Sequence, residues 1–173
     1  MENMNNDIYE LKNEKLDTIA LMLIDCYNEI IEQRELLNTS LDDAYLNLSR
    51  ARSLVGCSSL SIMQVPFELE PNVTVNSNTT QSCCLDSLQQ DIKYNETKFD
   101  LIIQTKQKTP DNSSVSKPMP AMPTWFGVLT PFCLKTSHKS FSESLYIIKT
   151  LCELQTKLFN LQTLYSDLKK EII

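Results

Sequence analysis

The sequence predicts a mainly α-helical fold, in which two long helices form an antiparallel coiled-coil hairpin with a small irregular or β crossover between them. The chain of 173 residues contains only two glycines, too few for the many tight turns of a β-barrel or β-sandwich. Apolar residues recur at a seven-residue spacing near both ends, which is typical of coiled-coil helices. Residues 107–123 (QKTPDNSSVSKPMPAMP) are instead rich in proline and serine, so they cannot continue either helix.

The first helix is predicted within residues 1–56. Two apolar rows begin near Leu16, and eleven of their twelve positions are apolar or aromatic. The rows are Leu16, Leu23, Ile30, Leu37, Ala44 and Ala51, and Ala20, Tyr27, Arg34, Leu41, Leu48 and Val55. Arg34 interrupts the second row, and it either extends to solvent or fixes the register by pairing with a carboxylate. Gly56 follows where a left-handed C-terminal cap is expected. A helix over most of residues 6–55 would be roughly 75 Å long.

A small extended or β crossover is predicted over residues 57–106. Residues 98–105 (KFDLIIQT) alternate in polarity, which favours a strand with Phe99, Leu101 and Ile103 on one side. Residues 60–75 also look extended, but two prolines, Pro66 and Pro71, restrict them to edge or irregular pairing.

A short helical turn is expected over residues 83–92, through Leu85, Leu88 and Ile92. Together these segments predict a small hairpin or weak sheet against the helices. The following residues, 107–123, are predicted to be a disordered tether, and the whole chain is treated as one domain.

The second helix is predicted within residues 124–173. Thr130 suits the N-cap and Pro131 the first helical position, where its missing N–H has no partner to lose. The main apolar row is Ile147, Leu151, Leu154, Leu158, Leu161, Tyr165, Leu168 and Ile172. A second stripe consists of Phe141, Leu145, Ile148, Cys152 and Phe159, so the first half of this helix is expected to contact more than one neighbour.

Charge and composition narrow the function classes. The formal net charge is -6, with 5 basic and 11 acidic residues in positions 1–56 and 6 basic and 4 acidic residues in positions 131–173. These opposite balances would let the two ends lie side by side, and no segment is basic enough to predict nucleic-acid binding.

The polar, acidic N-terminus lacks a signal-peptide pattern, and the apolar run Ile19–Ile24 is far shorter than the roughly 20 residues that span a bilayer. A soluble cytosolic protein is expected.

The cysteines and the single histidine do not predict catalysis. The six cysteines include no Cys-x-x-Cys pair, and a zinc site would need an unusual ligand set. Cys133 and His138 are five residues apart on the predicted helix and therefore share no face well. We expect no enzyme activity, no metal site and no cofactor.

An apolar knot precedes the second helix. Trp125, Phe126, Val128 and Leu129 surround Gly127, whose lack of a side chain permits close backbone approach. Two interpretations are open: the knot fastens the tether to the helical body, or its aromatic residues anchor a partner.

These residues carry a resemblance to a known family. The first motif consists of Trp125, Phe126, Gly127, Leu129, Pro131, Leu134, Lys135, Ser140 and Phe141. The second lies at the end of the first helix and consists of Tyr45, Leu46, Leu48, Ser49, Arg50, Ala51, Arg52 and Gly56. The chain resembles the vacuolar proton-pump (V-ATPase) assembly factors of the coiled-coil-domain-containing type, and its FDLIIQT segment resembles their lone middle strand. His138 stands where relatives usually have Gln, and Lys135 where Arg is usual.

The resemblance implies a non-enzymatic assembly chaperone for the membrane (Vo) sector of the proton pump. Its implied partners are a membrane-spanning V-ATPase assembly factor and Vo-sector subunits, with no nucleic acid and no small-molecule substrate. Its implied location is peripheral, through those partners, on the cytosolic face of the endoplasmic reticulum, with the ER-Golgi intermediate compartment and endolysosomes as further sites. Acidification of vacuoles or lysosomes would depend on it.

The candidate partner-binding residues come from the two motifs. They are Trp125, Phe126, Gly127, Leu129, Pro131, Leu134, Lys135, Phe141, Arg50 and Arg52. Trp125 and Phe126 also have a structural interpretation, as core packing of the tether, and the two arginines would complement the helix dipole near its C-terminus. Two other function classes stay open, namely a generic coiled-coil scaffold or tether that pairs between chains, and a thiol- or metal-dependent enzyme.

Overall fold

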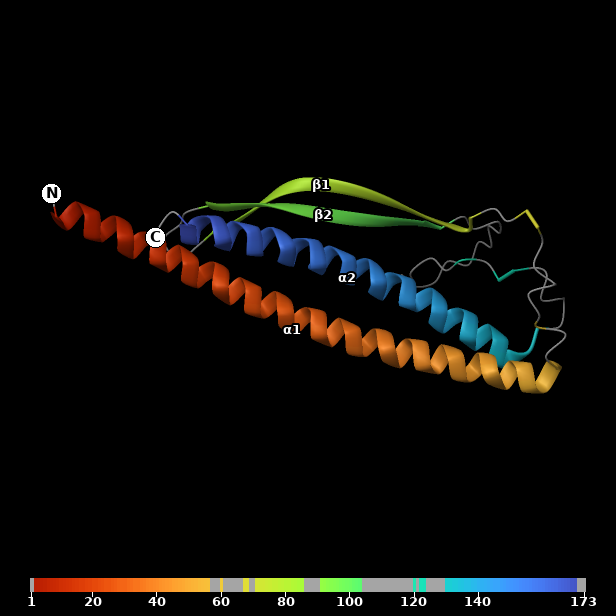
Figure 1. The fold of residues 1–173 in the computed structure, drawn as a ribbon. Coiled ribbons are helices and arrows are strands. Elements are labelled where there is room, and N and C mark those ends of the chain that lie inside the picture. The colour runs from red at the N-terminus through yellow and green to blue at the C-terminus, as the bar shows by residue number, and fades with distance from the viewer. Residues whose placement is uncertain are drawn as a thin grey trace, which may run out of the picture. The chain divides into compact units, whose positions relative to one another are not determined.

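The computed structural model describes residues 2–56, 60, 67–68, 71–85, 91–103, 120, 122–123 and 130–170. Its elements, in chain order, are α1 (Glu2–Val55), β1 (Val73–Leu85), β2 (Asp91–Ile103) and α2 (Phe132–Lys170) (Figure 1). The two strands form one antiparallel sheet. The predicted class, mainly helical with two long helices and a small β component, is confirmed.

The chain divides into two compact units, and both helices and both strands contribute to each. Unit 1 contains Met1–Arg34, Ser77–Phe99 and Thr150–Ile173, and unit 2 contains Glu35–Asn76 and Asp100–Lys149.

The core of unit 1 joins α1 to α2 through apolar side chains. Ile19 and Leu161 are fully buried together, and the side chains packed against them are Met22, Leu23, Leu164, Tyr165 and Leu168. Two turns further along each helix, the Cys26 thiol donates a hydrogen bond to the Leu154 carbonyl at 3.5 Å. Residue numbers rise along α1 as they fall along α2, so the two helices are antiparallel in this unit.

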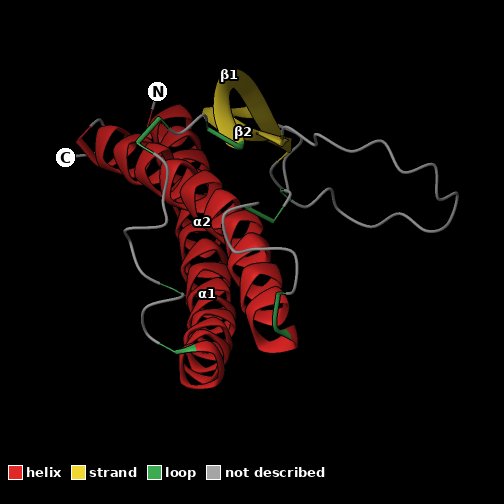
Figure 2. Cartoon of the chain, turned by 90° about the vertical axis from the view of Figure 1, so that its right-hand side faces the viewer, coloured by secondary structure: helices red, strands yellow, loops and turns green. Residues whose placement is uncertain are grey.

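The sheet covers a second side of α2 in unit 1 (Figure 2). The Phe99 amide donates to the Glu153 carboxylate at 2.8 Å, and the Asn160 side-chain amide donates to the Asn95 carbonyl. A backbone N–H that would face solvent at a sheet edge is therefore satisfied by a helix side chain. This contact explains why α2 is apolar over a wide arc.

Small residues form the corresponding seam in unit 2. Ala44 and Ala51 of α1 are fully buried, and Ser137 and Ser144 of α2 are no more than 2% exposed. The Ser137 hydroxyl donates to the Ala44 carbonyl at 2.8 Å, and the Ser40 hydroxyl donates to the Ser140 carbonyl at 3.1 Å. Residue numbers again run in opposite directions on the two helices. Small side chains permit the close approach that these hydrogen bonds require.

The predicted helix ends are reproduced with one shift. Gly56 adopts a left-handed φ of 88°, and its N–H donates to the Arg52 carbonyl at 3.0 Å. The α2 helix begins at Phe132, one residue later than predicted, because Leu134 and Lys135 both donate to the Pro131 carbonyl. Pro131 thus occupies the capping position that the sequence assigned to Thr130.

One of the two predicted rows on α1 is confirmed, and the other is displaced by one residue at its first two positions, while its members Leu41 and Leu48 are partly buried as predicted. Every member of the row from Leu16 to Ala51 is buried or partly buried. In the second row, however, Ile19 and Cys26 are buried in place of Ala20 and Tyr27, whose side chain is 45% exposed. A heptad seam alternates steps of three and four, and in this stretch apolar residues lie on both sides of the first row. The pattern alone therefore could not choose between Ile19 and Ala20, or between Cys26 and Tyr27, as the second row. Arg34 is exposed to solvent.

The strand prediction is partly right. Residues 98–103 lie in β2, with Phe99, Leu101 and Ile103 partly buried while the intervening residues are exposed, as predicted. The short helical turn over residues 83–92 is wrong, because residues 83–85 belong to β1 and residues 91–92 to β2. Backbone pairing between the strands outweighs a short local apolar repeat.

The resemblance implied a lone middle strand, whereas the structure has a pair. Of the extended segment predicted over residues 60–75, residues 73–75 lie in β1. The Trp125–Leu129 knot and most of the tether lie outside the described residues.

Candidate partner-binding surface

The structure describes six of the ten candidate partner-binding residues. Pro131 directly precedes α2, whose first part contains Leu134, Lys135 and Phe141. Arg50 and Arg52 lie at the end of α1, and all six residues are in unit 2. The other four, Trp125, Phe126, Gly127 and Leu129, lie outside the described residues.

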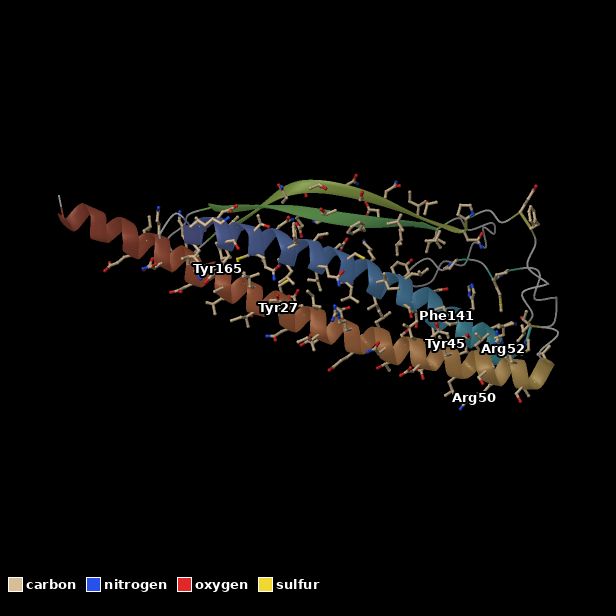
Figure 3. The ribbon with its side chains drawn as sticks, viewed as in Figure 1. Tyr27, Tyr45, Arg50, Arg52, Phe141 and Tyr165 are labelled. Carbon is tan, nitrogen blue, oxygen red and sulfur yellow. The ribbon has the colours of Figure 1, made fainter. Side chains whose placement is uncertain are left out.

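Among the apolar members of this set, Phe141 contacts α1 and Leu134 is buried. Leu134 is 3% exposed, and the ring of Phe141 meets that of Tyr45 edge to face, with centroids 5.2 Å apart at 86° (Figure 3). Ser140, another residue of the first motif, accepts the hydrogen bond from Ser40 through its carbonyl. Phe141 and Ser140 therefore join the two helices of unit 2.

The basic members are exposed, but the two arginines do not form one patch. Residues two apart in a helix are separated by about 200° around its axis, so Arg50 and Arg52 point to different sides. Figure 3 shows Arg50 directed away from α2. Arg52 lies in the last turn of α1, where its charge complements the helix dipole. Lys135, in the first turn of α2, is also exposed.

An apolar hollow of about 320 Å³ lies beside Phe141 in unit 2. Its lining consists of Leu41, Pro120, His138, Phe141, Ser142, Ser144, Leu145 and Ile148. Burial lowers the pKa of the His138 imidazole below its ordinary value of 6.5, which keeps the ring uncharged at neutral pH. Most of the side chains that line the hollow are apolar.

A second hollow, of about 380 Å³, lies between β2 and α2 in unit 1. Its lining consists of Thr97, Phe99, Cys152, Gln155, Thr156, Phe159 and Asn160. Phe159, 68% exposed, leaves much of its ring accessible to solvent. The predicted second stripe of α2 therefore lines hollows in both units.

The described residues contain no group of three or more His, Cys, Asp or Glu side chains placed to hold a metal ion. Burial is the main reason that the pKa of the Cys26 thiol is raised above 9.0, so the reactive thiolate is disfavoured there. Within the described ranges, neither helix has an apolar stretch long enough to cross a membrane.

Sequence reasoning missed the serine contacts between the helices in unit 2. Ser137, Ser140 and Ser144 recur at steps of three and four, the spacing that places residues on one helix face. The Ser144 hydroxyl lies 3.0 Å from that of Ser40 and also donates to the Ser140 carbonyl. This serine spacing on one helix, together with the small residues Ala44 and Ala51 on the other, could have predicted a closely packed seam of small residues.

The chain is similar over most of its length to known proteins. No model of a protein family matches it. It is 25% identical over 176 residues to the Vacuolar ATPase assembly protein VMA22 of Bos taurus, with 91% of each chain covered. It is 26% identical over 166 residues to the protein of that name in Mus musculus, covering 92% of each, and 24% identical over 172 residues to that of Danio rerio, covering 84% of each. The resemblance drawn from the two motifs is thereby confirmed: the chain is similar, over most of its length, to vacuolar ATPase assembly proteins.

Proposed function

We propose that this protein is a non-enzymatic assembly factor of the vacuolar ATPase. The observation that carries the proposal is the similarity to proteins named for this role, which extends over 91% of this chain and of the relative from Bos taurus. Because the similarity covers most of both chains, it supports a shared role more strongly than similarity confined to a short segment would.

In its finer form, the proposal places the action on the membrane (Vo) sector. The protein would bind a membrane-spanning assembly partner and Vo subunits at the cytosolic face of the endoplasmic reticulum, and then be released. The ER-Golgi intermediate compartment and endolysosomes would be further locations. The two helices would form a coiled-coil hairpin, which is supported by the antiparallel packing within each unit.

The physical features support binding over catalysis. The most deeply buried residues of both units join α1 to α2, which provides a stable body. Large apolar side chains nevertheless remain accessible, among them Phe159 at 68% and Leu21 at 63%. Such residues on a stable helical body are suited to recognising helices of another protein.

Expression in cells that lack their own relative of this protein tests the proposal. The chain is expected to restore lysosomal acidification, measured with a ratiometric pH dye. Affinity capture from detergent-solubilised cells is expected to recover Vo-sector subunits together with a membrane-spanning partner. Failure of both readouts, with normal expression, would reject the assembly role.

A paired substitution tests the apolar knot. Replacing Trp125 and Phe126 by Ala is expected to preserve helicity, measured by circular dichroism, but to impair acidification in the same cells. The control is Phe132→Ala, which removes a neighbouring aromatic ring that is 81% exposed and lies outside the motif. Normal acidification by the double variant would assign the knot to packing alone.

A further inference from the structure

The α1 helix has a second apolar row in unit 1, on the side away from its buried seam. Leu21, Ile24 and Ile31 are 63%, 55% and 54% exposed. At 100° per residue these three lie within about 80° of one another, and roughly 150° from the buried Ile19 and Cys26. Residues at these steps stand on one face of a helix. One apolar face of α1 is thus covered by α2, and the other is open to solvent.

Acidic side chains lie among the residues of this exposed row and along one side of it. Glu10, Glu14, Asp17, Asp25 and Glu32 are all exposed within the same sector of about 120°. The remaining residues of the sector are Asn13 and Asn28, so between residues 10 and 34 it contains no lysine or arginine. The basic residues of this stretch, Lys12, Lys15 and Arg34, fall elsewhere on the helix. We call this surface the acidic outer face.

We propose that the acidic outer face binds a basic amphipathic α-helix of a partner protein. Its apolar row provides the contact that helix recognition uses, with anchors at i, i+3 and i+10. Its carboxylates select a partner whose apolar residues are flanked by Lys or Arg, because charge complementarity speeds encounter and disfavours wrong partners.

The charge also argues against two other occupants. A second copy of the chain would bring five carboxylates against five of the same sign, which is unfavourable across an interface. An anionic membrane surface would repel the same groups.

The surface from Glu10 to Glu32 spans roughly 33 Å, which matches a partner helix of about 22 residues. The face itself depends only on unit 1, whereas the identity of its partner as part of the V-ATPase assembly machinery rests on the proposed function.

Fluorescence anisotropy with designed peptides tests the proposal on the full chain. The probe is a labelled helix of about 22 residues with leucines on one face and lysines beside them. Two matched peptides carry glutamate in place of each lysine, or the same composition with the leucines dispersed. The basic amphipathic peptide is expected to bind at least about tenfold more tightly than either, and more weakly as salt rises.

Substitutions in the chain locate the binding. The Leu21→Gln/Ile24→Gln variant is expected to lose at least about tenfold in affinity, and Asp25→Lys/Glu32→Lys a similar factor. The control is Leu36→Gln/Leu54→Gln, which removes two leucines of α1 that are 54% and 71% exposed in unit 2. The control is expected to bind like the unaltered chain. All of these positions are exposed, and circular dichroism verifies that each variant folds.

Three results would overturn the proposal. They are equal affinity for the basic and acidic peptides, unchanged affinity of the Leu21→Gln/Ile24→Gln variant, and a chain dimer in sedimentation that this variant abolishes. The last result would assign the face to a second copy. Peptide binding is measured without the vacuolar ATPase, so these results are independent of the cell test of the assembly role.

Discussion

Hydroxyl groups, rather than large apolar side chains, fill much of the seam between α1 and α2 in unit 2. Ser137 is 1% exposed and donates to the Ala44 carbonyl, while Ser144 is 2% exposed and donates to the Ser140 carbonyl. A buried hydroxyl without a partner would cost roughly 1–3 kcal/mol, so these hydrogen bonds make the polar seam tolerable. Among the described residues, no buried side-chain nitrogen or oxygen lacks a partner. The Ser137 hydrogen bond joins α2 to α1, whereas the Ser144 hydrogen bond lies within α2.

His138 makes the stability of the protein depend on pH. Burial lowers its folded-state pKa below 6.5, so the unfolded chain binds the proton more tightly than the folded chain does. Its contribution is therefore fully present above pH 6.5 and is lost as the pH falls through the folded-state pKa. We expect the urea midpoint to fall on acidification from neutral pH, and to fall less in the His138→Gln variant.

Glutamine is the appropriate control at this position. It keeps a polar side chain of similar size but does not titrate, and the Ser142 hydroxyl still finds the backbone carbonyl of residue 138, which it contacts at 2.7 Å. Equal acid sensitivity of the two proteins would show that other groups govern this pH range.

At the scale of the elements, α2 is apolar on two sides because it has two neighbours in unit 1. Leu161 faces α1 and is fully buried, whereas Phe159 lies beside the hollow that β2 shares with α2 and is 68% exposed. The hydrogen bond from the Phe99 amide to Glu153 attaches β2 to this second side. The two stripes therefore differ in how much of their surface is removed from water.

This difference predicts unequal costs for truncating the two stripes. Leu161→Ala is expected to destabilise the fold by about 2–5 kcal/mol, because it removes a fully buried side chain and leaves a cavity. Phe159→Ala, two residues away, is the control and is expected to cost much less, because most of the ring already contacts water. Urea denaturation measures both. A larger loss for Phe159→Ala would show that β2 covers its stripe more tightly than described.

At the scale of the whole molecule, the helical seams are completed within one chain. In unit 1 the buried row of α1 contacts α2, and in unit 2 Ala44 accepts a hydrogen bond from Ser137. A scaffold that pairs between chains would instead leave these seams for a second copy. We therefore expect sedimentation at micromolar concentration to give the monomer mass of 19.8 kDa. A stable dimer would favour the generic scaffold.

Charge is unevenly distributed between the two helices. The opposite charge balances of the two ends predicted that they can lie side by side, and α1 and α2 do pack against each other within each unit. Four ion pairs between described residues lie within α2, within β2 or between them, as in Lys149 to Asp100 at 3.9 Å. Part of the acidic character of α1 is displayed on its outer face. Exposed charge of one sign contributes little to folding and more to the choice of partner.

Periodicity and local chemistry were enough to predict both helices, the glycine cap and the apolar side of β2. Each of these depends on residues a few positions apart, as with Gly56 and the carbonyl of Arg52. The resemblance to the assembly factors also came from local motifs, in which Leu134 proves to be buried and Phe141 to contact Tyr45 of α1 in unit 2.

Tertiary structure decided what the local pattern left open. Ile19 or Ala20 could each complete the seam of α1, and contact with Leu161 selects Ile19. Residues 83–85 could continue a helical repeat, and pairing with β2 makes them a strand. The physical reason is the same in both cases. Burial and backbone pairing depend on segments distant in sequence, so the energies that choose between locally equivalent alternatives are absent from any short window of the chain.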